Sequence, residues 1–232
     1  MARGAHFLSL YTRLRSDVRR SAEPSLGVSD LDTLKQVINR VYSTLYYDHD
    51  WPHLRKVFPR VQLEAGSRYY DFPEGLNFER VESVAVWDNG LPSYITRGIS
   101  FDEYSGFDSS VPDTSEPVLK WDVRWMDTKD QIEVWPVPSS NSQELEFIGI
   151  QAISALVDDA DKCLLDDELV LLFAGAEILA ADKAADAPMR LQAAQARLKS
   201  VKNRTKTGMT CLRMGVEPQS EIMSGRAIVR VR

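Results

Sequence analysis

The chain has 232 residues, of which 44% are hydrophobic and 27% are charged, and its formal net charge is -6. This composition is typical of a globular protein and excludes a fibrous or wholly disordered chain. No stretch approaches the ~20 apolar residues that a membrane-spanning helix needs, and the arginine-rich N-terminus lacks the apolar core of a secretion signal, so we expect no membrane partner.

The charge is distributed unevenly along the sequence. Residues 1–20 carry +4, residues 197–232 carry +7, and the segment 21–196 carries -17. Two basic ends on an acidic body favour ends that dock on an acidic surface or on a phosphate backbone. Solvated basic tails give the same pattern, so both interpretations stay open on charge alone.

The N-terminal part predicts two helices. The first covers residues 5–20 and is followed by a breaker at residues 23–27. Ser29 is the expected N-cap of the second helix, which ends near Asp50 because Trp51-Pro52 does not continue a helix. The expected apolar face of the first helix contains Phe7, Leu8, Tyr11 and Leu14. The second helix has apolar residues at i, i+3, i+4 and i+7, namely Leu31, Leu34, Val37, Ile38, Val41, Tyr42 and Leu45.

Residues 54–153 have the pattern of short strands. Asp88-Asn89-Gly90 predicts a tight hairpin, because Asn and Gly tolerate the positive φ of such turns. The segment 119–125 alternates apolar and charged residues, which indicates a half-buried strand. Its expected core face holds Leu119, Trp121, Val123 and Trp125. Ser100 and Glu103 match a capping box and predict one short helix among the strands.

Helical spacing returns after this segment. Asp166-Asp167-Glu168 places negative charge at the start of one helix, and Pro188 suits the first turn of the next. Small residues make the first of these helices thin, so that a neighbour in the same chain or in another copy can approach closely. These residues are Ala174, Gly175, Ala180 and Ala181.

The order of elements predicts an α+β fold. Residues 1–53 and 154–203 form the two parts of one helical bundle, built from the N- and C-terminal helices. Residues 54–153 form an inserted, mainly antiparallel β domain, and residues 204–232 form an extended C-terminal arm.

The sequence offers little that could carry catalysis, and we expect no enzyme, no metal and no cofactor. His49 and His53 are spaced as two metal ligands on a helix could be, but Pro52 interrupts that helix, which favours a histidine pair at a helix end. The acidic run 158–168 has the charge of a calcium loop without the glycine and spacing of an EF-hand, which favours helix capping and solvated charge. The distant Cys163 and Cys211 are expected to be idle thiols.

Three short segments give the sequence a likeness to a known family. The first helix pair closes on Tyr46-Tyr47-Asp48-His49-Asp50-Trp51-Pro52, a strand ends at Tyr69-Tyr70-Asp71-Phe72-Pro73-Glu74, and a later strand ends at Val134-Trp135-Pro136-Val137-Pro138, before the helical hairpin and the arm. In this order, over residues 29–200, the chain resembles the head-to-tail adaptor (connector) proteins of short-tailed bacteriophages, of the tail tubular protein A type.

The resemblance implies a structural protein of the virion, assembled in the host cytoplasm. It implies a homo-oligomeric ring of about twelve copies between the portal protein and the tail nozzle, or tail tubular protein, with genomic DNA passing through the lumen without specific binding. In that family the bundle and arm tend to meet the portal, and the β part faces the tail. A tail-associated cell-wall hydrolase and another ring protein of the neck or tail remain alternatives.

The arm has a pattern that suits an added strand. In its last seven residues, Arg226, Ala227, Ile228, Val229, Arg230, Val231 and Arg232, alternate positions separate an apolar face from a face with three arginines. We expect this segment to bind the portal or a neighbouring copy; the alternative is that it folds back on its own bundle.

Overall fold

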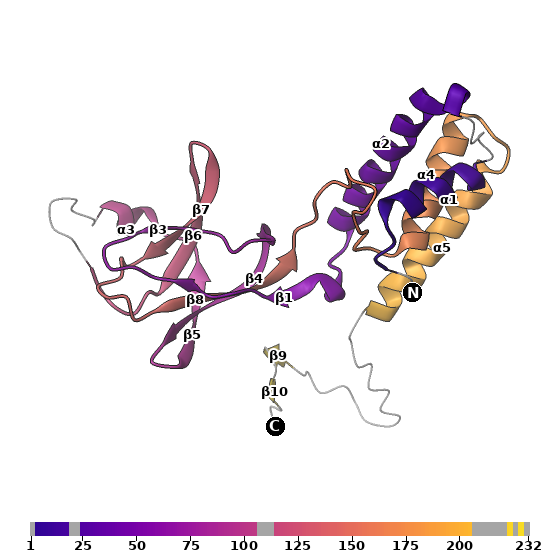
Figure 1. The fold of residues 1–232 in the computed structure, drawn as a ribbon. Helices are drawn as coiled ribbons and strands as arrows, with labels where there is room; N and C mark the ends of the chain where they lie inside the picture. Colours follow the sequence, from indigo (N-terminus) through magenta and orange to yellow (C-terminus); the bar gives the residue numbers. More distant parts are fainter. Residues whose placement is uncertain (1–2, 19–23, 106–113, 206–221, 225–226, 230–232) are drawn as a thin grey trace, which may run out of the picture.

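A computed structural model of the chain describes residues 3–18, 24–105, 114–205, 222–224 and 227–229; for 24–29, 104–105, 204–205 and 222–229 it describes the backbone alone. A helical bundle and a β domain lie one after the other along the long axis of the molecule (Figure 1). The predicted α+β class is confirmed, with helices from both ends of the chain in the bundle and the β domain inserted between them.

The N-terminal part of the bundle contains α1, Phe7–Asp17, and α2, Pro24–Asp48. The prediction that Ser29 caps this second helix is wrong, because the helix already begins at Pro24 and includes Gly27. A first-turn residue has no helical partner for its N–H, so proline fits there rather than ending the helix. Leu8 was expected on the apolar face of α1, but it lies on the exposed side, because the buried stripe is Phe7, Leu10 and Leu14.

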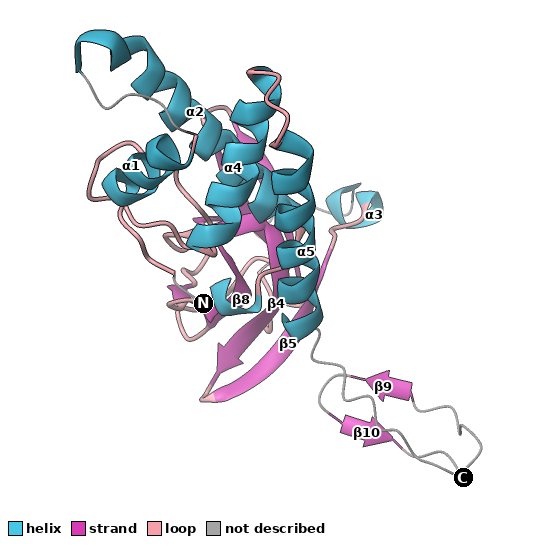
Figure 2. Ribbon diagram, turned by 90° about the vertical axis from the view of Figure 1, so that its right-hand side faces the viewer, coloured by secondary structure: helices cyan, strands magenta, loops and turns pink. Residues whose placement is uncertain are grey.

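The C-terminal part contains α4, Asp167–Ala181, and α5, Ala187–Thr205. As predicted, the acidic triplet begins α4, where the Asp166 side chain caps the helix by accepting a hydrogen bond from the Leu169 N–H at 3.0 Å. Pro188 lies in the first turn of α5, also as predicted. Figure 2 shows α4 between α1 and α5, and α2 packs against it as well.

The β domain is one curled mixed sheet in the described part of the chain. Its strands are β1 (Arg55–Val57), β2 (Val61–Gln62), β3 (Tyr69–Asp71), β4 (Leu76–Asp88), β5 (Leu91–Arg97), β6 (Lys120–Met126), β7 (Lys129–Trp135) and β8 (Glu144–Gln151). Their order is β1-β8-β4-β5-β6-β7-β3, with β2 also paired to β8. The described pairs are antiparallel except for β5 with β6, which run parallel.

Local sequence signals in the β domain have the predicted outcome. Asn89 and Gly90 both have positive φ, at 48° and 79°, in the β4–β5 turn. The Ser100 N–H and hydroxyl donate to Glu103 at the start of the short α3, Phe101–Ser105. A hydrogen bond from Lys120, followed by those from Ser100, lowers the pKa of Glu103 to about 2.

The expected burial of the 119–125 strand is only partly correct. Trp121 is buried among the strands, but Leu119 and Trp125 are exposed. The β6–β7 ladder extends beyond the sheet core, so its outer residues alternate in direction without meeting a covering layer. The core of the β domain contains Phe58, Leu63, Tyr70, Leu76, Val84, Val86, Ile95, Val118, Trp121, Ile132, Val134, Leu145 and Phe147.

A hydrogen-bonded junction joins the bundle to the β domain. The Tyr46 hydroxyl at the end of α2 donates to the Gln151 carbonyl at 3.0 Å and accepts from the Asn77 amide at 2.9 Å. Arg80 of β4 donates to the Tyr46 carbonyl at 2.8 Å and forms an ion pair with Asp50 at 2.9 Å. The junction therefore fixes β4 and β8 to the end of α2 through both backbone and side-chain groups.

We predict that Tyr46→Phe destabilises the protein by about 1–3 kcal/mol, because the buried Asn77 amide and the Gln151 carbonyl lose their shared partner. Urea unfolding measures the change. The matched control is Tyr47→Phe, whose ring is exposed and whose substitution is expected to stay within about 0.5 kcal/mol. Equal losses for the two variants would contradict the role of the Tyr46 hydroxyl.

Candidate interaction surfaces

An apolar groove of about 750 Å³ lies between α2 and α5, with α4 as its floor. Each of the three helices contributes side chains at helical spacing, so that three rows of side chains face the groove. The lining consists of Arg40, Val41, Thr44, Leu45 and Asp48 from α2; Phe173, Ala176, Glu177 and Ala180 from α4; and Ala187, Pro188, Leu191 and Leu198 from α5. Such a groove is suited to a row of apolar side chains from another protein.

The charged groups bordering the groove are paired across the helices. Arg40 of α2 forms an ion pair with Glu177 of α4. Asp48, at the end of α2, pairs with Lys202 of α5 at 2.6 Å. The first pair joins α2 to α4 and the second joins α2 to α5, so that the three helices are held together around an apolar floor.

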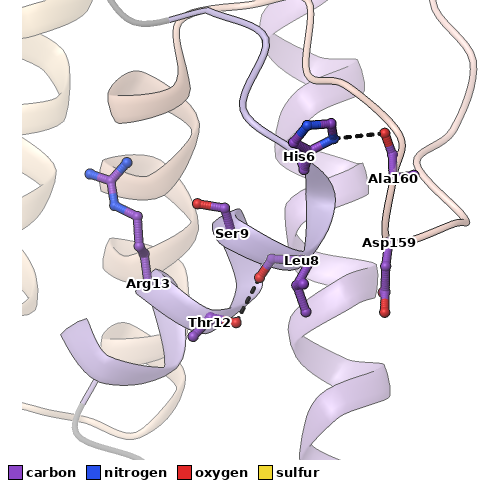
Figure 3. Close-up of a pocket in the computed structure, with 7 residues that line it drawn as sticks. All are labelled: His6, Leu8, Ser9, Thr12, Arg13, Asp159 and Ala160. Carbon is purple, nitrogen blue, oxygen red and sulfur yellow. Dashed lines mark hydrogen bonds between the residues drawn. The ribbon is translucent and has the colours of Figure 1, made fainter.

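A second, shallower pocket of about 660 Å³ lies over α1 (Figure 3). Its lining side chains come from α1, from His6 just before it, and from the loop at Asp159 and Ala160. The His6 ring is hydrogen-bonded to the Ala160 carbonyl at 2.9 Å, which fixes the start of α1 to that loop. The bundle thus has hollowed surfaces both over α1 and between α2 and α5.

The acidic run 158–168 holds the N-terminal segment and α4 in place. Asp166, buried at the α4 N-terminus, pairs with Arg197 of α5 at 2.9 Å. Asp167 accepts the Ala5 N–H at 3.3 Å, and burial raises the pKa of its carboxyl. The other described contacts are Asp161 with the Val157 and Asp158 N–H groups, Asp159 with Lys35 and Tyr11, and Glu168 with Arg13. Helix capping, expected from the sequence, is confirmed at Asp166.

The two histidines flank the buried Trp51, whose indole N–H donates to the Leu45 carbonyl at 3.0 Å. His53 Nε2 lies 2.8 Å from the Leu164 carbonyl, to which it donates. Burial lowers the pKa of both His49 and His53. Among the residues that the structure describes, no group of three or more His, Cys, Asp or Glu side chains could hold a metal ion.

Burial of the Cys163 thiol raises its pKa to about 12, which makes it a poor nucleophile. Cys211 lies outside the described residues. No helix within the described ranges is long and apolar enough to cross a membrane.

The four small residues predicted for close packing lie in two different environments. Ala174 and Gly175 are buried inside the bundle. A Cβ on Gly175 would lie 2.8 Å from Nε of Arg190, so the missing side chain gives Arg190 room to cross α4 and pair with Asp17 of α1. Ala180 and Ala181 are exposed, and Ala180 lines the groove.

The predicted arm residues are described only in part. Ala227, Ile228 and Val229 form β10, which pairs antiparallel with β9, Ile222–Ser224. Arg226, Arg230, Val231 and Arg232 lie outside the described residues. Figures 1 and 2 place this two-stranded sheet away from both the bundle and the β domain.

Sequence reasoning missed the groove and the exposed apolar residues of the hairpins. The groove has no local signal, because its walls come from helices that are more than 100 residues apart in the sequence. The hairpin residues did have one: Trp125 and Tyr94 lie within a few positions of a turn, where strands leave the core.

Comparison with known proteins identifies the family of this chain. A family model described as SU10 adaptor protein matches residues 7–215. No curated protein matches the chain.

The lowered histidine pKa values predict acid sensitivity. Because the unfolded chain binds these protons near the ordinary pKa of about 6.5 and the folded protein binds them only at lower pH, stability falls as the pH drops below about 6.5. His53→Gln preserves a donor for Leu164 and should lose less stability than the parent between about pH 7 and pH 5. Urea unfolding across this range tests it, and an unchanged pH dependence would contradict it.

Proposed function

Because the chain belongs to the SU10 adaptor protein family, it is a bacteriophage head-to-tail adaptor and a structural component of the virion, and we propose that it forms a ring of about twelve copies. The ring joins the portal protein to the tail nozzle, and genomic DNA passes through its lumen. The family match is the observation that carries this proposal, since it extends over the bundle and the β domain.

The surface of the chain supports assembly into a ring. A closed ring needs two different surfaces on each copy, because one face contacts the next copy and another face contacts the previous one. The groove between α2 and α5 and the pocket over α1 are hollowed surfaces on different parts of the bundle. We infer that Ala180 and Ala181, at the exposed end of α4, allow close approach of a neighbouring helix there.

The arm supports attachment to the portal. A two-stranded sheet by itself is marginally stable in water, and β9 with β10 lies apart from both domains. We propose that the segment 226–232 adds as a strand to, or lies in a groove of, the portal or a neighbouring copy, with Arg226, Arg230 and Arg232 paired to acidic groups. Ordering the segment costs about 1–2 kcal/mol per residue in conformational entropy. Its partner therefore has to form hydrogen bonds with the backbone of the segment as well as with its arginines.

The same fold does not favour the hydrolase alternative. A glycosidase needs two carboxyl groups free to act on one bond. The two carboxylates that line the groove are Asp48 and Glu177, and each is held in an ion pair with a basic side chain. Paired carboxylates of this kind suit a surface that binds another protein more than a site that transfers protons.

We predict that the full chain is monomeric alone and forms rings when its cognate portal is added, whereas a chain lacking residues 208–232 folds normally but attaches to portals more weakly by at least about tenfold. Mass photometry and electron microscopy of the mixtures measure both. The matched full-length controls replace Arg226, Arg230 and Arg232 with Lys, which retains binding, or with Glu, which weakens it.

Two results would count against this account. Absence of rings with portal present would overturn the ring. Attachment of the truncated chain at full strength would show that the arm is not the anchor, and the segment would then fold back on its own bundle.

We also predict that the protein does not bind DNA in a sequence-specific way. The segment 21–196, which contains the β domain and most of the bundle, carries -17, and like charges repel the phosphate backbone that dominates DNA affinity. Fluorescence anisotropy with two unrelated duplexes at physiological salt measures this. Nanomolar binding to one duplex with weak binding to the other would contradict a passive conduit.

A further inference from the structure

Two β-hairpins leave the sheet in opposite directions, roughly perpendicular to the long axis of the molecule (Figure 1). One is β4–β5, which turns at Asn89 and Gly90, and the other is β6–β7, which turns at Asp127 and Thr128. Their tips lie at a similar position along the long axis, in the β domain and away from the bundle.

The β4–β5 hairpin presents two large side chains to solvent, Leu91 at the turn and Tyr94 in the middle of β5, on opposite faces of the strand. Leu91 is 75% exposed and Tyr94 is 73% exposed. Next to them, Pro92 is opposite Trp87 in the ladder, and the Arg60 guanidinium lies 3.8 Å from the centroid of the Trp87 ring. Arg60 is itself held by two carboxylates of β8, Glu144 and Glu146, so the surface beneath this tip is fixed.

The β6–β7 tip has the same character. Trp125 is 62% exposed and Met126 is 40% exposed. Trp125 is on the strand face of Trp121 and therefore continues the core face of β6 beyond the sheet. Beside Trp125, Arg124 pairs with the buried Glu133 of β7 at 2.8 Å, which joins the two strands close to the turn.

We propose that the two tips contact each other between adjacent copies, with Leu91 and Tyr94 of one copy packed against Trp125 and Met126 of the next. The proposal rests on the proposed ring. Exposed aromatic and Met side chains are typical of the buried cores of interfaces. A contact between unlike surfaces on opposite sides of a subunit is the kind that closes a ring.

The partner of each hairpin tip is a second copy of this chain, because every copy carries one β4–β5 tip and one β6–β7 tip. The tips point away from each other, so they do not meet within one molecule. When elongated copies stand side by side, the direction toward a neighbour is perpendicular to the long axis, and both hairpins point that way. An unrelated tail protein would account for one exposed tip, whereas side-by-side copies account for both.

Cysteine cross-linking in the assembled ring tests the contact. The full chain carries Cys211→Ser with Leu91→Cys and Thr128→Cys, and is assembled on its cognate portal and treated with a short bismaleimide. The buried Cys163 does not compete, since its thiol stays protonated. We expect a ladder of covalent oligomers well beyond the dimer, and monomer only from either single-cysteine chain.

Each other outcome has a distinct meaning. Rings that form without a ladder would overturn the tip contact and leave the proposed function intact. Dimers from one single-cysteine chain would show like tips together and also overturn it. Failure of the parent chain to form rings would overturn the proposed function and the contact with it.

A second measurement follows the energy of the contact. Tyr94→Ala and Trp125→Ala should each raise the concentration needed for ring assembly by at least about tenfold, with an unchanged urea midpoint because both side chains are exposed in the single chain. Phe101→Ala is the matched control, since Phe101 is an even more exposed aromatic in the same domain but outside both hairpins. Assembly unchanged in both hairpin variants would overturn the proposal.

Discussion

The structure depends on one helix, α4, that is buried along most of its length. Most of α4 is buried, with apolar residues on all sides: Leu169, Val170, Leu171, Ala174, Ala176, Ile178 and Leu179. A helix that is hydrophobic all round has to be covered on several sides. The covering comes from α1 and α2 at one end of the chain and from α5 at the other. This requirement brings the two ends of the sequence together and leaves the β domain as an insertion between them.

The junction then transmits the position of the bundle to the β domain. Tyr46 belongs to the bundle core and its hydroxyl also bonds Asn77 and Gln151 of β4 and β8. Since β4 continues into the β4–β5 hairpin, the orientation of that hairpin is set from the end of α2. In the proposed ring, contacts in the bundle and at the hairpin tips would therefore be made at a fixed separation, and each would favour the other through a high effective concentration.

The sequence predicted those features that depend on neighbouring residues. Asn89-Gly90, the Ser100 and Glu103 capping box, and the Asp166 cap each involve residues a few positions apart, and the structure has all three. The α+β class followed from the period changes along the chain. The start of α2 was misplaced because Pro24 can either end one helix or begin another, and residues 23–27 alone do not distinguish these cases.

Features that depend on tertiary packing could not be obtained in this way. Trp125 follows the apolar and charged alternation of its strand, yet it is exposed. The other strands determine where the core of the sheet ends, and the β6–β7 hairpin extends beyond that point. The groove likewise requires α2 and α5 to sit on either side of α4, joined by the Asp48–Lys202 ion pair. Of the small residues in α4, the sequence could not tell that Gly175 serves Arg190 within the chain while Ala180 faces outward.

A ring subunit has to satisfy two opposed requirements, since it must stay soluble alone and adhere in the assembly. A single large apolar patch would promote aggregation before the partner is met. In this chain the exposed apolar side chains are spread over several places, among them the groove, the two hairpins and Phe101 of α3, and ion pairs such as Arg40 with Glu177 border the groove. In the proposed ring, closure engages the surfaces on both sides of every copy together, so that several contacts act as one interface.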